Sequence, residues 1–573
     1  MGIKLKKYSS ALVVIFIFLS AALVVAGVWI YQNHSSVSTA GQIISLVSQL
    51  KDFDNKKLDE YNPASQRAVD VKHYTIKIDL YPEQKKILGD VTISIRLLDH
   101  LTDKIDLNFY GNLKIKKLEV NGSNSDFTQS EKILSIKKPD EDLDSADVRI
   151  VYEGTPESLG FGSFYFGNEE GSSVVYSLNE PIYASTWFPC VDLPDDKALA
   201  DIYVTNDSSK VSLSNGKLID IKTKQSRRTY HWKTFYPIST YLIAIYSANY
   251  KSSTEKYISI DRDTVDLAFY ALPKEFEDAR KDFSDHSKYL RAFEELFGPY
   301  PFPKEKYSVA EFWWETGAME HQTITGIGSN FISGKHFFSD MLIHELAHHW
   351  WGDAVGPKTW KDVWLNEGFA TYSVALYWEK QAGFKALHST MSSITNSFDN
   401  GTLYNPGTAI FGPLVYDKGA WVLHMLRKVV GDKNFFKILK EYFSQYKYGN
   451  ASTNDFKNVC EKISEKNLNY FFNEWVFKGQ GIIDLQYDWN SSQFGQKFST
   501  IIQIKQLQKG FDIYKFPLDI KLIFDNGDQS VVSTEYVTSR EQEIKLISKS
   551  KPTKIELDPD SWLLANINLK SEN

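Results

Sequence analysis

The sequence has little cysteine and no segment dominated by positive charge. Only two cysteines, Cys190 and Cys460, occur in 573 residues, which excludes a disulfide scaffold; we expect both thiols to be buried small hydrophobes. The 65 Lys and Arg residues are outnumbered by 72 Asp and Glu residues, and the net charge of -7 is spread along the chain. This balance lacks the basic footprint of a nucleic-acid binder, so we expect no nucleic-acid partner.

No internal repeat is apparent, and the composition argues against disorder of the bulk chain. Hydrophobic residues make up 42% of the sequence and aromatic residues 14%, as in folded globular proteins. A chain of this length is too long for a single hydrophobic core. We therefore expect a protein of several domains.

An uncharged run stands near the N-terminus. Lys4, Lys6 and Lys7 precede a run from Ala11 to Tyr31, whose length matches the about 20 helical residues that cross a bilayer core. A cleavable signal peptide has only about 7–15 apolar residues before a small-residue cleavage site, and no A-x-A site ends this run. We expect an uncleaved, single-pass signal anchor in the cell membrane, with the body of the chain extracytoplasmic. Secretion after cleavage is the alternative.

The pattern of apolar residues changes twice along the chain. From about Val69 to Lys251 it alternates with period two, and "HYTIKIDLYPEQKKILGDVTISIRLL" predicts two strands around a polar turn. From about Ser253 to Gln480 the apolar residues recur at three and four, as in helices. After Ile482 strands return, and a "DNG" turn predicts a hairpin. About 90 residues of this type suggest a small β-sandwich. Helical periodicity is predicted over 273–298, with Gly298 as terminator, and helices are predicted at 341–351, 363–380, 419–430 and 434–446.

These patterns predict an α+β multidomain fold. A large N-terminal β-sheet domain is followed by a mostly helical domain and a small C-terminal β-sandwich, behind an N-terminal transmembrane helix. The predicted boundaries are 1–10 for a cytoplasmic tail, 11–31 for the signal anchor, 32–67 for a stalk, 68–252 for the β domain, 253–481 for the helical domain and 482–573 for the sandwich.

The segment "SDMLIHELAHHWWG" places metal-binding side chains on a predicted helix. Ser339 or Asp340 is the expected N-cap and Gly352 the expected terminator. His344 and His348 are four residues apart, so a helix presents both imidazoles on one face. Two imidazoles in this arrangement suit zinc, which binds nitrogen at about 2.0–2.1 Å.

The same segment and the next predicted helix supply a base and a third ligand. Glu345 follows the first histidine and is placed to act as a general base on water. Because a catalytic zinc has three protein ligands and an open position, the third ligand should come from a neighbouring element. Glu367 in "WLNEGFATY", eighteen residues after His348, is the candidate. His349 faces elsewhere, and we expect it to pack or form hydrogen bonds.

These motifs resemble those of the gluzincin aminopeptidases of the aminopeptidase N type. The family signature is H-E-x-x-H, eighteen residues and a Glu in "NEGFA". "GAMEH" at 317–321 resembles the family's G-x-M-E-N exopeptidase motif, and "EPIYASTWFPCVDLP" from Glu180 resembles its E-P segment. "YDKGAWVLHMLR" from Tyr416 resembles its Y-E-K-G helix, with Asp417 in place of Glu. The order of domains also agrees from about Val69 onward.

The resemblance implies a zinc-dependent aminopeptidase that removes N-terminal residues from peptides, with one zinc per chain and zinc-activated water as the nucleophile. It implies a saddle-like N-terminal β domain, a thermolysin-like catalytic domain and a short form without the family's helical C-terminal domain. The expected partners are peptides with a free N-terminus. The implied metal ligands are His344, His348 and Glu367; the catalytic residues are Glu345, as base, and Tyr416, as donor to the oxyanion; the substrate-binding residues are Glu180, Gly317, Ala318, Met319 and Glu320.

Besides Asp417, the sequence departs from the family pattern at two further positions. His321 stands where the family has Asn, which bears on how the substrate backbone is held, and Ser185 replaces a common Arg. The preferred N-terminal residue and the oligomeric state stay open. Trp313, Trp314 and the loop 399–413 are candidate walls of the substrate pocket by position alone.

Three other functions compete with this reading. A non-catalytic binding protein on the same fold would lose zinc ligands or the base, and all of these are present here. An epoxide hydrolase, as in one branch of the family, would need a lipid channel, and no segment of the sequence resembles one. A thermolysin-like endopeptidase is disfavoured by the two carboxylates, Glu180 and Glu320, that would bind a free amine.

Overall fold

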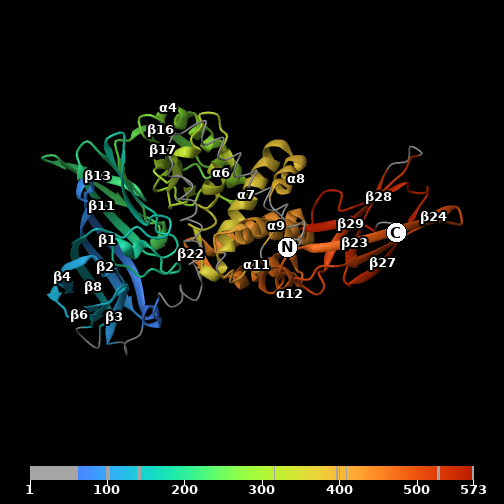
Figure 1. The fold of residues 1–573 in the computed structure, drawn as a ribbon, viewed down its shortest axis with the longest axis horizontal. Helices are drawn as coiled ribbons and strands as arrows, with labels where there is room; N and C mark the ends of the chain where they lie inside the picture. The colour runs from blue at the N-terminus through green and yellow to red at the C-terminus, as the bar shows by residue number, and fades with distance from the viewer. Residues whose placement is uncertain are drawn as a thin grey trace, which may run out of the picture. The chain divides into compact units, whose positions relative to one another are not determined.

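The computed structural model describes residues 62–98, 103–138, 143–314, 317–394, 398, 401–407, 410–525 and 530–570. The predicted cytoplasmic tail, the signal anchor at 11–31 and most of the stalk at 32–67 therefore lie outside the described residues. Within the described ranges, no helix has the length and apolar character needed to cross a membrane. Figure 1 shows the described chain passing from blue and green strands through yellow helices to red strands.

The N-terminal region consists mainly of β-sheet. The predicted strand pair is confirmed: β1 (Val69–Tyr81) and β2 (Lys86–Leu97) are antiparallel, with Tyr81 opposite Lys86. Buried and more exposed side chains alternate along β2, because successive residues of a strand face opposite sides. Both strands lie in an eight-stranded sheet of order β13-β14-β11-β1-β2-β8-β4-β5. The other strands are β4 (Lys114–Val120), β5 (Ser123–Asn124), β8 (Ser145–Gly154), β11 (Leu199–Asp207), β13 (Lys217–Lys224) and β14 (Arg227–Lys233).

Two smaller sheets complete this region. A four-stranded sheet has the order β12-β15-β10-β9, and its strand β10 (Ser172–Ser177) leads directly to Glu180. A three-stranded sheet has the order β3-β7-β6. Their remaining strands are β9 (Phe164–Glu169), β12 (Val211–Ser214), β15 (Ile245–Ala248), β3 (Lys104–Asn108), β6 (Phe127–Gln129) and β7 (Ile133–Lys137).

The central region contains a sheet that the sequence pattern did not indicate. Helical character was predicted from Ser253, but five strands lie in this region in the order β16-β17-β18-β20-β19, and two of them precede the first helix, which corrects that prediction. Strand β18 is buried along its whole length, so it shows no alternation to mark it as a strand. The strands are β16 (Lys251–Ile258), β17 (Thr264–Ala271), β18 (Tyr307–Phe312), β19 (Ala318–Met319) and β20 (Ile324–Gly328).

Helices form most of the rest of the central region, together with the short strands β21 (Val355–Pro357) and β22 (Gly449–Ala451), and each predicted helix is present with at least one end shifted. The helical stretch predicted over 273–298 begins only at Phe276 and is divided into α4 and α5, and Gly298 (φ 117°) ends α5 as expected. The helices are α4 (Phe276–Asp282), α5 (His286–Phe297), α6 (Ser339–Ala347), α7 (Trp364–Ala382), α8 (Phe384–Ser393), α9 (Pro413–Val430), α10 (Asp432–Tyr446), α11 (Thr453–Ser464) and α12 (Asn469–Phe472).

The predicted N-cap of α6 is wrong. Phe338 occupies that position, and its side chain makes no capping hydrogen bond. The hydroxyl of Ser339 instead donates to the carbonyl of His336 (2.9 Å). Asp340 accepts a hydrogen bond from the indole of Trp378 in α7 (2.7 Å), so its carboxylate joins the two helices. A tertiary partner has thus replaced the local capping bond.

Helices α7 and α9 cross at a pair of glycines. A Cβ atom built on Gly368 would lie 2.8 Å from the Cα of Gly419, and the converse distance is the same. A side chain at either position would therefore force the helices apart, because real Cβ contacts of this length are essentially absent. The close approach brings the first turns of both helices together, and Glu367 and Tyr416 lie on those turns.

The C-terminal region returns to strands in two sheets. The predicted hairpin of β25 and β26 is present and antiparallel, while its "DNG" turn falls partly outside the described residues. Both sheets bury apolar side chains, which supports the predicted small β-sandwich. The sheets have the orders β27-β24-β23-β29 and β26-β25-β28, with β23 (Ile483–Phe494), β24 (Lys497–Gln506), β25 (Phe516–Ile523), β26 (Val531–Val537), β27 (Glu541–Ser548), β28 (Lys554–Leu557) and β29 (Ala565–Leu569).

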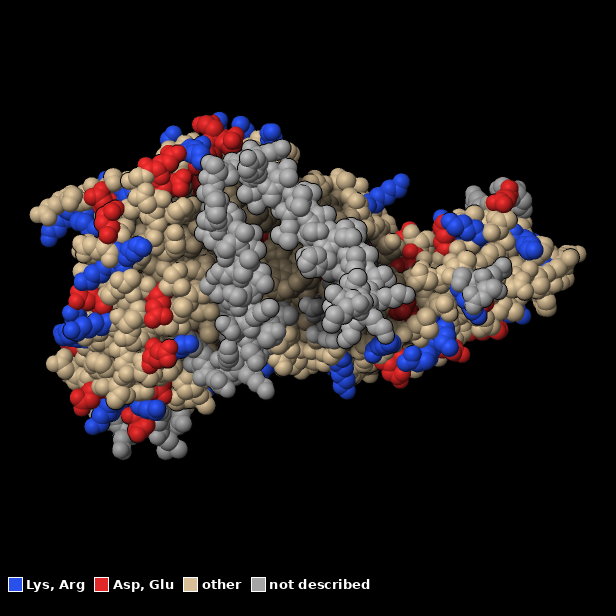
Figure 2. Space-filling model, in the orientation of Figure 1, with Lys and Arg blue, Asp and Glu red and all other residues tan. Residues whose placement is uncertain are grey.

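The predictions for cysteine and for charge agree with the structure. Cys190 and Cys460 are both free and buried. On the face shown in Figure 2, Lys and Arg side chains are interspersed with Asp and Glu side chains. This mixture matches the spread of charge along the sequence.

Candidate metal centre

Helix α6 presents two histidines at one point. The helix ends at Ala347, and His348 continues it in helical conformation (φ −57°, ψ −25°) before Gly352 (φ 131°) turns the chain away. The Nε2 atoms of His344 and His348 lie 3.0 Å apart. The predicted convergence of the two imidazoles is therefore present.

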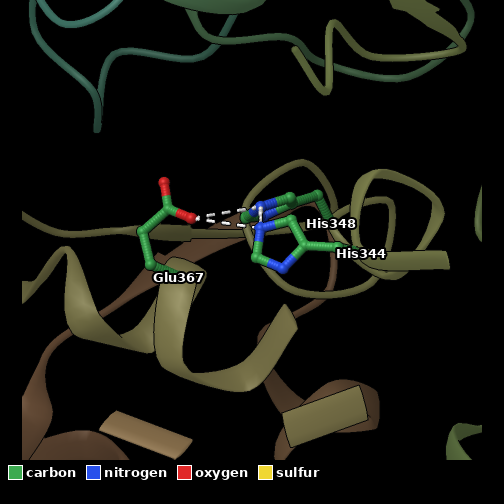
Figure 3. Close-up of side chains that lie close together, drawn as sticks. All are labelled: His344, His348 and Glu367. Atoms are coloured by element: carbon green, nitrogen blue, oxygen red, sulfur yellow. Dashed lines mark hydrogen bonds and ion pairs between the residues drawn. The ribbon is translucent and has the colours of Figure 1, made fainter. Parts of the chain in front are cut away.

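Glu367 completes a three-ligand group from the first turn of α7. Its Oε2 atom lies 3.4 Å from Nε2 of His344 and 3.3 Å from Nε2 of His348, as Figure 3 shows. Two atoms bonded to zinc at 2.0–2.1 Å with a tetrahedral angle are about 3.3–3.4 Å apart. This Oε2 atom is also buried without a hydrogen bond. The donor set and its spacing therefore fit one zinc ion with an open fourth position.

A neighbouring carbonyl fixes the orientation of one ligand. Nδ1 of His348 donates to the carbonyl of Trp351 (2.9 Å), which leaves Nε2 deprotonated and free for a metal. The third histidine behaves as predicted: His349 is fully buried, its Nδ1 donates to the carbonyl of Glu345 (3.3 Å), and its Nε2 accepts from the backbone of Thr323 (3.0 Å). Burial lowers the pKa of His349 to about 3, so this side chain stays neutral.

Four buried carboxylates give the site an excess of acid. Burial raises the pKa of Glu180, Glu320 and Glu345. Burial also acts to raise the pKa of Glu367, but the adjacent imidazoles outweigh it and lower that pKa to about 2. Among the described residues that line the cavity, none is a Lys or an Arg. Since buried charges need partners, the site calls for cations: a metal ion and a second positive group.

Glu345 and Tyr416 lie in the same cavity, which measures about 80 Å³. Oε2 of Glu345 is buried and accepts no hydrogen bond. The ring of Tyr416, from α9, lies nearly parallel to that of His344 with centroids 5.9 Å apart. Burial raises the pKa of Tyr416 well above its usual value, so its hydroxyl remains a proton donor.

Glu180 and Glu320 reach the cavity from two regions of the chain. Both are buried, and Oε1 of each accepts no hydrogen bond. One oxygen from each lies within 4.8 Å of an oxygen of Glu367. Glu180 follows β10 of the N-terminal region, and Glu320 follows β19 of the central sheet. The unpaired oxygens are therefore grouped beside the metal ligands.

The residues just before Glu320 form a sheet edge. Ala318 and Met319 make up β19, the last strand in its sheet, and both line the cavity. Gly317 accepts a hydrogen bond from the backbone of Gly328 (3.0 Å) and lies at the start of this edge rather than among the lining residues. An edge strand has unpaired backbone groups, to which an extended peptide can add.

Two of the departures from the family pattern, Ser185 and His321, have partners in the structure. Ser185 donates from its hydroxyl (3.1 Å) and its backbone N–H (3.3 Å) to the carboxylate of Asp192, and these bonds support the segment after Glu180. His321 is fully buried; its Nδ1 lies 2.5 Å from the hydroxyl of Tyr246, while its Nε2 makes no hydrogen bond.

The walls of the cavity were only partly predicted. Trp314 and Phe411 line it, as their positions indicated, whereas Trp313 packs against Tyr165 outside it. Phe161 and Leu178 also line the cavity and were not predicted. The only signal for Phe161 is its place between two glycines in "LGFGSF".

Two family models match the chain. The peptidase family M1 domain matches residues 282–475, and the peptidase M1 N-terminal domain matches residues 70–242. Together the two models cover more than half of the chain. All three predicted metal ligands lie in the first match, and Glu180 lies in the second.

Similar proteins include "Probable aminopeptidase 1" of Sulfurisphaera tokodaii, which is 26% identical over 75% of this chain. Among solved structures, Legionella pneumophila aminopeptidase A in complex with aspartic acid has a TM-score of 0.78, is 18% identical and covers 88% of this chain. A mutant M1 zinc metallopeptidase of Deinococcus radiodurans, bound to a Tyr-Ser-Ala substrate, has a TM-score of 0.63, is 24% identical and covers 72% of this chain. At these identities the two structures establish the fold alone.

The matches cover different shares of the other proteins. The chain spans 58% of the Sulfurisphaera protein and 60% of the Legionella chain, but 94% of the Deinococcus chain.

Proposed function

The chain belongs to peptidase family M1, and from that premise we propose that it is a zinc-dependent aminopeptidase that hydrolyses N-terminal residues from peptides. One observation carries the proposal. The three ligand atoms of His344, His348 and Glu367 converge at zinc-like spacing beside two buried carboxylates that lack partners. A metal ion accounts for the first group, and a substrate ammonium accounts for the second.

Glu345 moves the proton in the proposed reaction. Zinc bound by His344, His348 and Glu367 would lower the pKa of water toward about 7 and polarise a carbonyl. The carboxylate of Glu345 takes the proton from the attacking water and returns it to the nitrogen of the leaving amine.

Tyr416 stabilises the charge that develops on the substrate. Attack on the peptide carbonyl turns its oxygen into an oxyanion, which needs a donor already in place. The hydroxyl of Tyr416 stays protonated and lines the same cavity as Glu345. It donates a hydrogen bond to this oxygen.

Glu180 and Glu320 bind the N-terminal end of the substrate. Their unpaired oxygens accept hydrogen bonds from the N-terminal ammonium. The edge of β19 holds the substrate backbone in extended form. A peptide that continues beyond this point would have no ammonium to pair with the carboxylates, so internal segments are excluded.

A blocked N-terminus should abolish most of the activity. Because acetylation removes the charge that pairs with Glu180 and Glu320, we expect kcat/KM for an N-acetylated aminoacyl substrate to fall by about 10²–10⁴-fold. Matched free and acetylated fluorogenic substrates, tested with the zinc-loaded protein and again after chelation, measure this. Chelation should remove the activity toward free substrates, and added zinc should restore it.

Glu320→Gln serves as the internal control for that experiment. It should lower kcat/KM for free substrates by about 10–100-fold with unchanged zinc content. Equal cleavage of free and acetylated substrates would indicate an endopeptidase instead. If the zinc-loaded protein cleaves neither, the chain is a binding protein on this fold.

For localisation, we propose that residues 11–31 anchor the chain in the cell membrane with its catalytic region extracytoplasmic. The support is the sequence alone: three lysines before an uncharged run of membrane-spanning length. The full chain should sediment with membranes and resist extraction at alkaline pH, whereas a chain starting at residue 62 should be released. Recovery of the full chain in the supernatant would contradict the proposal.

A further inference from the structure

The cavity has an apolar side that the proposed reaction does not use. Apart from the metal ligands, Tyr416 and the carboxylates, every described lining residue is apolar: Phe161, Leu178, Trp314, Ala318, Met319 and Phe411. We call these six residues the apolar wall. We infer that the apolar wall selects peptides whose N-terminal residue has a large apolar side chain, aromatic above all; this inference rests on the proposed function. Acidic N-terminal residues are excluded by the same wall.

Three aromatic rings support one another across the cavity. The ring of Phe161 lies edge-on to Trp314, with centroids 5.6 Å apart, and edge-on to Phe411, with centroids 5.7 Å apart. Trp314 also packs against Phe312 (5.8 Å), and Phe411 against Trp360 (6.5 Å). Edge-to-face contacts of this kind are favourable and directional. The rings therefore form a continuous surface that a further aromatic ring can join.

The rings come from separate parts of the chain, and the loop of Phe161 is held by its own hydrogen bonds. Gly160 (φ 54°) and Gly162 (φ 111°) flank Phe161 in left-handed backbone conformations. The hydroxyl of Ser163 donates to the carbonyl of Glu157 (2.7 Å) and accepts from the backbone of Leu159 (3.0 Å). This loop from the N-terminal region is thus closed on itself and presents one aromatic side chain to the site.

The charges around the apolar wall disfavour a substrate with an acidic N-terminal side chain. Four carboxylates line the cavity, and no Lys or Arg lies among its described lining residues. An acidic N-terminal side chain would be desolvated beside these carboxylates without a partner. A basic side chain could lie over an aromatic face, but three of the four carboxylates are already paired with the metal and the substrate ammonium, and Glu345 faces the attacking water.

Met319 makes the wall adaptable to size. It is buried beside Glu320 and also lines the cavity. A thioether chain is flexible and polarisable, and it makes favourable contacts with aromatic rings. We therefore expect both leucyl and phenylalanyl side chains to fit.

A panel of fluorogenic substrates with Phe, Leu, Ala, Arg or Glu as the aminoacyl group tests the inference. Because one methylene in an apolar pocket changes kcat/KM by about 10–200-fold, we expect Phe and Leu to exceed Ala by at least about 10-fold. We expect Glu to be slower than Phe by about 100-fold or more. Equal rates, or faster cleavage of the Arg or Glu substrate, would overturn the inference while leaving the proposed aminopeptidase function intact.

The variant Phe161→Ala tests the wall directly. It should lower the ratio of kcat/KM between Phe and Ala substrates by about 10-fold or more, and Phe161→Leu should lower it less. Phe494→Ala, at an exposed position of β23, is the matched control and should leave the ratio unchanged. An unchanged ratio in folded Phe161→Ala, or in Phe161→Leu if the first variant unfolds, would overturn the inference.

A binding measurement separates this inference from the proposed function. Calorimetry with free phenylalanine and free aspartate on the zinc-loaded protein needs no turnover. If phenylalanine binds more tightly than aspartate but no substrate is cleaved, the inference about the apolar wall is supported and the proposed aminopeptidase function is contradicted. Equal or tighter binding of aspartate would reject the apolar selection.

Discussion

Replacing Glu345 by Gln is expected to lower kcat by about 10²–10⁴-fold, the usual contribution of a positioned general base. The amide has nearly the same shape as the carboxylate but cannot accept the proton of water. Glu345 is buried and lines the cavity beside the metal ligands without being one of the three. Zinc content and the unfolding temperature should therefore stay close to those of the unchanged protein. Steady-state kinetics, elemental analysis and thermal unfolding measure the three quantities.

The matched control is Glu441→Gln, at a partly exposed position of α10 outside the cavity, where the carboxylate pairs with Lys462. It should leave kcat unchanged. A Glu345→Gln protein with kcat within about threefold of the original would rule out the assigned role. Loss of zinc together with activity would instead make Glu345 part of the metal site.

Replacing Glu367 by Ala should remove both the metal and the activity. The change leaves two imidazoles and deletes the only anionic ligand of the group, whose oxygen lies 3.3–3.4 Å from both nitrogens. With the third of three protein ligands lost, zinc should fall from one per chain toward zero after dialysis. We expect kcat/KM to fall by at least about 10³-fold, since every catalytic contribution of the ion is lost with it.

Thermal unfolding gives a second readout for the same variant. A ligand at 1,000 times its dissociation constant stabilises the folded state by about 4.1 kcal/mol. Zinc should therefore raise the unfolding temperature of the unchanged protein and have little effect on Glu367→Ala. Glu295→Ala, which removes a surface carboxylate paired with Lys380, should keep the zinc response. A Glu367→Ala protein with one zinc and full activity would contradict the metal site itself.

The metal ligands could be predicted because their geometry is local. His344 and His348 lie one helical turn apart, so a helix alone brings their Nε2 atoms together. Glu367 lies on a second helix, so helix geometry alone could not place it beside the histidines. The motif "NEGFA" identified it as the third ligand. The sequence could not locate Phe161 in the site, because the loop that holds it reaches the cavity only through tertiary packing with Trp314 and Phe411.

The missed sheet of the central region has a related cause. Period-two alternation reveals strands with one wet face, but all six residues of β18 are buried. The buried partners of His321 and Ser185 could not be predicted from the sequence either. Tyr246, the partner of His321, is far away in sequence, and Asp192 reaches Ser185 only through the fold of the loop between them. Local periodicity identified helices and exposed sheets, while contacts between distant segments set the walls and supports of the site.

The crossing of α7 and α9 at Gly368 and Gly419 affects how the site binds its metal ion. With backbone against backbone at that point, the two helices form one rigid unit, and the carboxylate of one and the phenol of the other are preorganised before any metal arrives. Capture of the ion then requires little rearrangement of the chain. An alanine at either glycine would uncouple metal affinity from turnover: the ion could still bind, but the tyrosine would stand at the wrong distance from the reacting carbonyl.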